Sequence, residues 1–348
     1  MKPYEELTRR GRARRIRGLA RAALDAYGLI PARFSLVALA GNALYRIYTR
    51  EALPSGSCDG LFEEDQLLLR LHWPGYRETE AIRAELAWLE AMRRERQLPV
   101  PEPMPTPGGE LLTKVSVAGV PEARDCSLLR WVKGRRLGER ARCRHYRAQG
   151  RLMAELHTFA SGWRRSGRGR ERRYDWAGMF RTTPALCLPV SDVWSLLSPS
   201  SRALFEAVAE RVRQVMGELG DGPDAFGLIH ADLGVDANLL FSGGQARAID
   251  FDELGLGYWV YDLAVALEHC REDPRFPRYR SALLTGYSEI RTLPERQIQH
   301  IELFMAGLDV YLGLWANAVM HLYPNPSEYV RTRAARSVRL VKQYLGGS

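Results

Sequence analysis

The pattern of apolar residues changes near residue 134, from strand-like before that point to helix-like after it. Before residue 134, apolar runs and alternation with a period of two predict strands, and apolar positions three or four residues apart predict helices between them. Strands are expected at 33–50 (two strands and a small turn), 66–73, 110–117 and 125–132, and helices at 1–28 and 78–97. The polar stretch 51–66 predicts a hairpin loop.

Beyond Gly134 the pattern predicts a mainly helical region with a single β-rich interruption, residues 227–253. Helices are expected at 142–162, 199–219, 261–271, 295–320 and 327–345. The interruption predicts a short strand, a loop, a second strand, a Ser-Gly-Gly turn and a third strand. A small sheet lobe followed by a helical lobe is an α+β, two-lobed plan. We expect domains at 1–132 and 133–348, with the hinge within 128–134.

Composition narrows the class of protein. The 348 residues are 46% hydrophobic and 26% charged, which is ordinary for a globular enzyme. No stretch approaches 18 consecutive apolar residues, and the N-terminus has no apolar signal core, so neither a membrane span nor a secretory signal is expected. Five scattered cysteines without a CxxC pair predict a reducing, cytoplasmic setting.

The chain is basic, with a net charge of +9, and all but four of its 50 basic residues are arginine. A basic chain can bind nucleic acid or polyphosphate ligands. The densest arginine runs, 9–21 and 164–173, contain few aromatic residues and are expected to form solvated surfaces. We therefore expect nucleic acid to be an unlikely partner.

Acidic residues gather in the β-rich interruption. Asp232 precedes one predicted strand, and Asp250 and Asp252 follow the next. Strands joined by a tight turn bring those ends together, and clustered carboxylates repel one another unless a cation or proton lies between them. With the amide oxygen of Asn238 the donor set is all oxygen, which suits Mg²⁺ and phosphoryl transfer. The alternative is that these acids are ordinary turn residues.

Three motifs follow one another along the chain: HxD…N, IDFD and GxxxYDLA. Together they resemble the motifs of the superfamily of aminoglycoside phosphotransferases, choline kinases and homoserine kinases, which are relatives of the protein kinases. Three further segments extend the resemblance over most of the chain: LRLHWPGYRETEAIRAELAWLEAM at 69–92, LLRWVKGRRL at 128–137 and GRLMAELH at 150–157. It implies a bilobal protein-kinase-like fold with a small antiparallel-sheet lobe and a larger helical lobe, and ATP and Mg²⁺ as cofactors.

The resemblance assigns roles in the helical lobe. Asp232 matches the catalytic base, and the metal ligands match Asn238, Asp250 and, beside them, Asp252. His230 matches a histidine that supports the loop from behind. Asp262 matches an acid at a helix start that steadies the loop, and on sequence alone it is a plausible N-cap.

The resemblance also assigns residues of the small lobe to the nucleotide. Arg70 stands where the family usually has a lysine that holds the phosphates, and Glu85 is its expected partner; arginine stays charged and binds phosphate bidentately. Two alternatives remain open: Arg70 could be an ordinary surface arginine, and Glu85 could pair with an arginine on its own helix. The loop over the phosphates matches Gly41 and Asn42, and the adenine is expected near Leu129 and Trp131.

One departure affects the metal site. The family's asparagine lies five residues after the base, but Asn238 lies six residues after Asp232. Either a one-residue bulge near Gly234 leaves Asn238 on the metal, which we favour, or Asp236 takes over as a ligand.

The expected function is ATP/Mg²⁺-dependent phosphate transfer to a hydroxyl of a small molecule: an amino alcohol, a sugar or an antibiotic-like compound. A Ser/Thr protein kinase of the stress-response type and an inactive nucleotide-binding pseudokinase are the alternatives. The chain has no GxxxxGK[ST], GxSxG or HExxH motif, which argues against those other chemistries. We expect the acceptor near Trp259, Asp309, Tyr311 or Trp315.

Overall fold

The computed structural model describes residues 4, 6–40, 42–50, 60–163, 171–181, 188–323 and 325–347; the side chains of residues 9 and 40 are excluded. The chain divides into two compact units. The first contains Met1–Arg135, Ser166–Arg170 and Arg247–Ile249, and the second contains Arg136–Arg165, Glu171–Ala246 and Asp250–Ser348.

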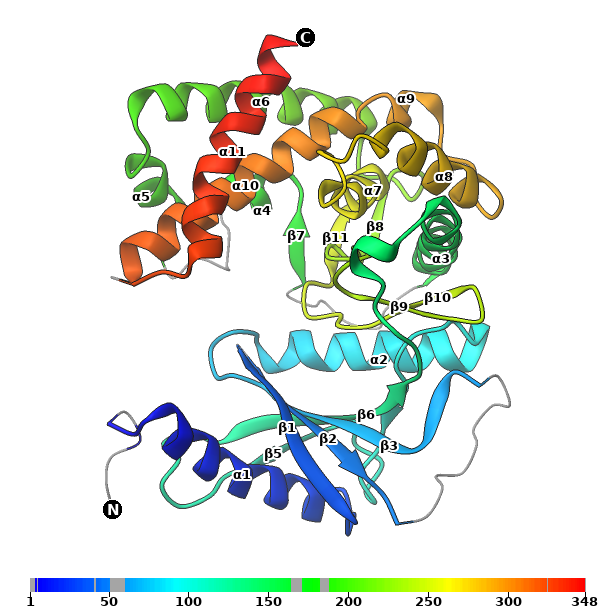
Figure 1. The fold of residues 1–348 in the computed structure, drawn as a ribbon, viewed down its shortest axis with the longest axis vertical. Helices are drawn as coiled ribbons and strands as arrows, with labels where there is room; N and C mark the ends of the chain where they lie inside the picture. The colour runs from blue at the N-terminus through cyan, green and yellow to red at the C-terminus, as the bar shows by residue number, and fades with distance from the viewer. Residues whose placement is uncertain are drawn as a thin grey trace. The chain divides into compact units, whose positions relative to one another are not determined.

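The first unit is an antiparallel sheet with a helix on each face (Figure 1). Its strands lie in the order β1-β2-β3-β6-β4, with β5 paired to β6. The bounds are α1 Arg9–Ala26, β1 Arg33–Ala40, β2 Asn42–Tyr48, β3 Phe62–Leu71, α2 Thr79–Arg96, β4 Pro103–Met104, β5 Leu112–Val115 and β6 Arg124–Val132. Strand β3 begins at Phe62, so the predicted loop over 51–66 is wrong at its C-terminal end.

Helix α1 is amphipathic, and its apolar side forms one half of a core with the sheet. Ile16, Leu19 and Leu24 pack with Tyr45 and Leu69 of the strands. The helix begins where the side chain of Thr8 caps the N–H of Gly11 (3.2 Å). Four of its arginines consequently remain exposed to solvent: Arg10, Arg14, Arg17 and Arg21.

The second unit is mainly helical and contains two small sheets. Strands β7 and β8 flank β11, and β9 pairs with β10 at the end of the β-rich segment. Its strands are β7 Arg172–Tyr174, β8 Phe226–Ile229, β9 Leu239–Ser242 and β11 Gly255–Tyr258, with the first two residues of β10 Gln245–Ala248; the last two residues of β10 belong to the first unit. Its helices are η1 Gly138–Arg140 (3₁₀), α3 Cys143–Gly162, α4 Trp176–Phe180, α5 Val190–Ser195, α6 Pro199–Leu219, α7 Trp259–Glu268, α8 Phe276–Ser288, α9 Glu295–Ile298, α10 Ile301–Leu322 and α11 Glu328–Gly346.

A buried ion network joins α7, α10 and α11. Arg333 contacts Glu268 (2.6 Å) and Asp309 (3.4 Å), and Arg271 contacts the other oxygen of Asp309 (2.5 Å). Burial raises the pKa of Asp309 to about 6, against the opposing effect of the two arginines. The network holds α11 against α7 and α10. It also occupies both carboxylate oxygens of Asp309, a residue that we expected near the acceptor.

Among the described residues, one helical stretch, Glu295–Leu322, is long and apolar enough by length and composition to cross a membrane. Of its most apolar window, 72% is buried inside the protein. The core helices of globular proteins have this property.

Helix α8 was not predicted, although its sequence carries a helical signal. Tyr279, Leu283 and Tyr287 lie four residues apart and are buried, and α8 packs extensively on α3. Pro277 stands at the start of the helix, where its missing N–H costs nothing. The short elements β7, β11, α4 and α5 were also missed.

Candidate active site

The predicted catalytic segment runs from the end of β8 to the start of β9. His230, directly after β8, is buried, and its ring lies 4.4 Å from that of Phe251. Its Nδ1 accepts the N–H of Asp232 at 3.3 Å. His230 therefore lies behind the loop and shapes its backbone, and Asp232 is partly accessible.

Asp262 holds the same loop from the other direction. Its Oδ1 accepts the N–H of Ala231 at 2.7 Å, and its Oδ2 lies 3.0 Å from His157 Nε2. Ala231 has φ +62°, a left-handed backbone that costs free energy for a residue with a Cβ. The contacts with the buried carboxylate offset that cost. The N-cap interpretation of Asp262 is wrong, because Tyr258 is the N-cap of α7.

His157 and Tyr287 extend this support, and neither was predicted. Burial lowers the pKa of His157, so the ring is neutral, although Asp262 opposes the shift. A neutral ring that donates to Asp262 through Nε2 accepts from the Tyr287 hydroxyl through Nδ1, at 2.9 Å. The chain from Tyr287 to Ala231 thus fixes the orientation of Asp262. The only sequence signal was the histidine that ends GRLMAELH.

The Asn238 side chain points back to Asp232. Its Nδ2 donates to Asp232 Oδ2 at 2.7 Å and to the Asp232 carbonyl at 3.0 Å. The residues between them form a turn in which the Ala237 N–H donates to the Gly234 carbonyl (3.1 Å). Asp236 points elsewhere, toward His269 Nδ1 (3.4 Å). The longer loop therefore accommodates its additional residue in the turn and keeps the Asn238 amide beside Asp232.

The surroundings of Asp232 change its pKa. Burial raises the pKa of Asp232, and the nearby Asp250 charge adds to the shift, while His230, His269 and the Asn238 hydrogen bond oppose it. Asp250 is exposed and has φ +63°, a conformation that Asp and Asn tolerate better than most residues. This backbone presents its carboxylate to solvent near Asp232.

In the first unit the structure brings Arg70 and Glu85 into contact. Arg70 on β3 is buried, and its Nη2 lies 2.5 Å from Glu85 Oε1 on α2. Arg77, which we did not predict, contacts the other oxygen of Glu85. Burial alone would raise the pKa of Glu85, but Arg70 and Arg77 outweigh it and lower that pKa to about 2.

Replacing Glu85 with Gln is expected to destabilise the protein at neutral pH by roughly 3 kcal/mol, because two buried arginines lose their counter-charge. The folded-state pKa lies below the usual 4.5, so the unfolded chain binds more protons between the two values. The stabilisation is therefore present above pH 4.5 and is lost as the pH falls toward 2. Urea unfolding of both proteins from pH 7 to pH 3 measures it. A constant difference across that range would contradict the assignment.

Three of the other predicted nucleotide residues lie on the same sheet: Asn42, Leu129 and Trp131. The Asn42 Oδ1 accepts the Trp73 N–H at 3.0 Å, which ties the start of β2 to the chain after β3. Gly41 lies outside the described residues. Leu129 is buried on β6, and the Arg46 guanidinium lies 4.4 Å above the Trp131 ring. Their roles toward a nucleotide stay predictions.

The model of the family described as "Phosphotransferase enzyme family" matches residues 61–298, which is more than half of the chain. The chain belongs to the phosphotransferase enzyme family. The match runs from the start of β3 to α9 and includes both the Arg70–Glu85 pair and the Asp232 loop.

Relatives within this family act on small molecules. A homoserine kinase of Sinorhizobium fredii (strain NBRC 101917 / NGR234) is 28% identical over 224 residues, which covers 61% of each chain. The match thus spans less than two thirds of that kinase. The structure of a microcompartment-associated aminopropanol kinase is 26% identical, covers 95% of this chain and 98% of its own, and has a TM-score of 0.74.

A third similarity concerns the fold. An amicoumacin kinase, solved in complex with AMP-PNP, Ca²⁺ and Ami, is 15% identical, covers 94% of this phosphotransferase and 93% of its own chain, and has a TM-score of 0.74. The predicted α+β, bilobal kinase-like fold and the predicted family are confirmed.

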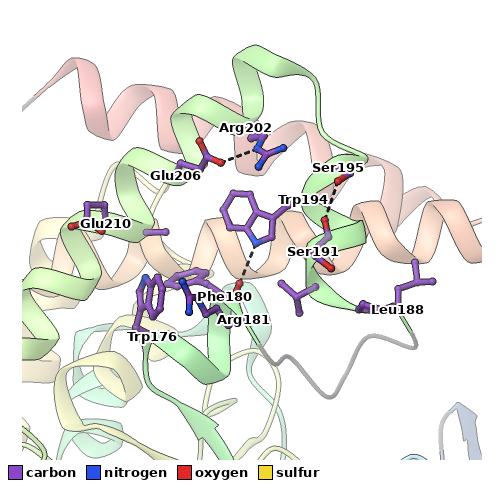
Figure 2. A pocket seen from close by; sticks show the side chains of 13 residues that line it. Trp176, Phe180, Arg181, Leu188, Ser191, Trp194, Ser195, Arg202, Glu206 and Glu210 are labelled. Atoms are coloured by element: carbon purple, nitrogen blue, oxygen red, sulfur yellow. Dashed lines mark hydrogen bonds and ion pairs between the residues drawn. The ribbon is translucent and has the colours of Figure 1, made fainter.

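The second unit also contains a cavity of about 1020 Å³ between α4, α5 and α6 (Figure 2). Its walls carry the rings of Trp176, Phe180 and Trp194, and the Trp194 Nε1 donates to the Phe180 carbonyl at 3.1 Å. Each of its two acids faces an arginine: Glu206 pairs with Arg202 at 2.8 Å, and Glu210 pairs with Arg213 at 2.7 Å. None of the predicted site residues is among those that line it.

Of the four residues expected near the acceptor, two belong to the core. Trp259 is fully buried, with its ring centroid 4.6 Å from that of His157, and Asp309 lies in the ion network. Tyr311 packs against Tyr174 at 6.5 Å, and Trp315 packs against Tyr329 at 6.3 Å.

Proposed function

We propose that this phosphotransferase moves the γ-phosphate of ATP to a hydroxyl group of a small amino alcohol, with Mg²⁺ as cofactor. The observation that carries the proposal is the Asn238–Asp232 contact of 2.7 Å, held in place by the Asp262–Ala231 contact. A carboxylate fixed in this way can accept the proton of an attacking hydroxyl in a defined direction. Asp232, whose pKa is raised, is a stronger base than an ordinary aspartate.

The residues present fit a magnesium ion. Asn238 uses its nitrogen for both hydrogen bonds to Asp232, and its Oδ1 has no hydrogen-bond donor among the residues that the structure describes, so this oxygen could face a cation. Asp250, and Asp252 two residues on, would supply carboxylate oxygens, and oxygen donors suit Mg²⁺. No group of three His, Cys, Asp or Glu side chains that could hold a metal occurs among the described residues. Mg²⁺ binds through one or two carboxylates plus phosphate and water, so this sparse set is sufficient.

Arg70 would bind the phosphates of ATP, and Glu85 would hold its guanidinium in place. The pair is buried at a distance of 2.5 Å, and Arg77 supplies a second positive charge to the same carboxylate. Preorganised cations of this kind stabilise charge on the transferring phosphoryl group, and a bound Mg²⁺ would neutralise further phosphate charge. Leu129 and Trp131, with Asn42 and Gly41, would complete the nucleotide site of the first unit.

The acceptor class is drawn from the relatives. Homoserine and aminopropanol are both small amino alcohols. A polycationic aminoglycoside would need an acidic surface to bind. In the cavity of the second unit, both acids already face arginines, and the chain as a whole has a net charge of +9. These observations favour a small acceptor. The reaction uses ATP, so we also propose a cytoplasmic location.

An acceptor panel tests this proposal. ADP release is measured with ATP and Mg²⁺ in the presence of homoserine, 1-amino-2-propanol, choline, an aminoglycoside or casein. We expect an acceptor-dependent rate with at least one of the amino alcohols. Activity with casein alone would indicate a protein kinase, and nucleotide binding without any turnover would indicate a pseudokinase; either result would overturn the proposal.

A further inference from the structure

The arginine-rich face of α1 has no part in the proposed reaction, yet it lies beside a second exposed feature. Strand β1 is at one end of the sheet order and pairs only with β2 among the described strands. The strand presents Leu36 and Val37 to solvent, and Ile30 just before it is 80% exposed. An edge strand with exposed apolar residues is a template for pairing with another chain.

Two hollows lie along the boundary between α1 and β1. One, of about 450 Å³, is lined by residues from Arg17 to Phe34. The other, of about 440 Å³, is lined by Arg10, Ala13 and Leu36–Leu39. We call the two together the α1–β1 groove. Both lie within the first unit, and no residue that lines them belongs to the proposed active site.

The charge of the groove is strongly one-sided. Its walls hold four arginines, Arg10, Arg17, Arg21 and Arg33, and one acid, Asp25. The side chain of Arg17 lies 4.2 Å above the Phe34 ring and Arg33 lies 4.2 Å above the Tyr48 ring, so both guanidinium groups are held beside the strand. None of the four forms an ion pair with a residue that the structure describes.

We infer that the α1–β1 groove binds an acidic, extended peptide segment of a partner protein. Its carboxylates would meet the arginines, and alternate apolar side chains would cover Ile30, Leu36 and Val37. A register shift between Leu36 and Ala38 leaves Val37 without a partner on β2, so this side chain is presented at the edge. Charge complementarity would orient the segment, and main-chain pairing along β1 would hold it extended.

Other polyanions fit the groove less well. Stacking of nucleic-acid bases requires exposed aromatic rings, but Phe34 is buried beneath Arg17. An anionic membrane requires a projecting surface, whereas this one is hollowed.

The test measures binding of a fluorescent peptide of about ten residues that alternates Glu and Val to the full chain. The same peptide with Gln in place of Glu, single-stranded DNA and phosphatidylserine vesicles serve as competitors. The Arg10→Glu/Arg21→Glu variant removes two groove arginines that form no ion pair or side-chain hydrogen bond within the described part of the structure. The Arg94→Glu/Arg96→Glu variant makes the same change of net charge at exposed positions on α2, outside the groove.

We expect the acidic peptide to bind at least about tenfold more tightly than its Gln counterpart, and the groove variant to lose about tenfold in affinity. The α2 variant should bind like the wild type, and Val37→Asp should weaken binding in the same direction as the groove variant. No binding of the acidic peptide up to about 1 mM, equal binding of the Gln peptide, or an unaffected groove variant would overturn the inference. Tighter binding of DNA or vesicles would do so as well.

Discussion

Asp232→Asn is expected to lower kcat by about 10³-fold, with nucleotide affinity unchanged. Asparagine keeps the shape of the side chain and can still accept the hydrogen bond from Asn238 Nδ2, but it cannot take a proton from the acceptor hydroxyl. The loss should therefore fall on the chemical step. The measurement is kcat with the best acceptor of the panel, beside the dissociation constant of a fluorescent ATP analogue.

Asp236→Asn is the matched control for this substitution. It makes the same chemical change four residues away, at an exposed side chain that faces His269. We expect kcat to stay within about twofold of the wild type, as at most surface positions. If Asp232→Asn kept more than about a tenth of the wild-type kcat, Asp232 would not be the base.

Asp250→Asn should have the second largest effect. Asparagine tolerates the φ of +63° at this position, so the backbone is retained while the charge is lost. We expect kcat to fall by about 10²-fold and the Mg²⁺ concentration for half-maximal activity to rise by about tenfold or more. A Mg²⁺ titration of activity measures both quantities.

The same titration separates the two explanations of the long loop. If Asn238 serves the metal, Asn238→Ala shifts the Mg²⁺ dependence and Asp236→Asn does not. The reverse result would show that Asp236 has taken over as the ligand, in contradiction to the direction in which its side chain points.

The sequence was sufficient for the family and for much of the secondary structure, because periodicity and motif spacing are local properties. The resemblance implied the contact of Arg70 with Glu85, which joins a strand to the helix after it across only 15 residues. It also implied that Asp262 steadies the loop, but the full chain Tyr287–His157–Asp262–Ala231 could not be foreseen in the same way. It joins four segments, and the local rule for an acid at a helix start gave Asp262 an N-cap role that the fold does not use.

The long loop shows the same limit. A spacing of six residues is compatible with several turns, and only the backbone shows that Gly234–Ala237 form one that leaves Asn238 beside Asp232. Helix α8 is a different case. Its buried residues are periodic in the sequence, and its exposed arginines and its proline obscured a signal that was present.

The most direct test of the proposed function is the transfer itself. The full chain is incubated with γ-³²P-labelled ATP, Mg²⁺ and homoserine or 1-amino-2-propanol, and the products are separated. The account predicts a labelled phosphomonoester of the amino alcohol with the wild type, and none above background with Asp232→Asn. Label found only in inorganic phosphate or in protein, or an amino-alcohol product that survives in Asp232→Asn, would contradict it.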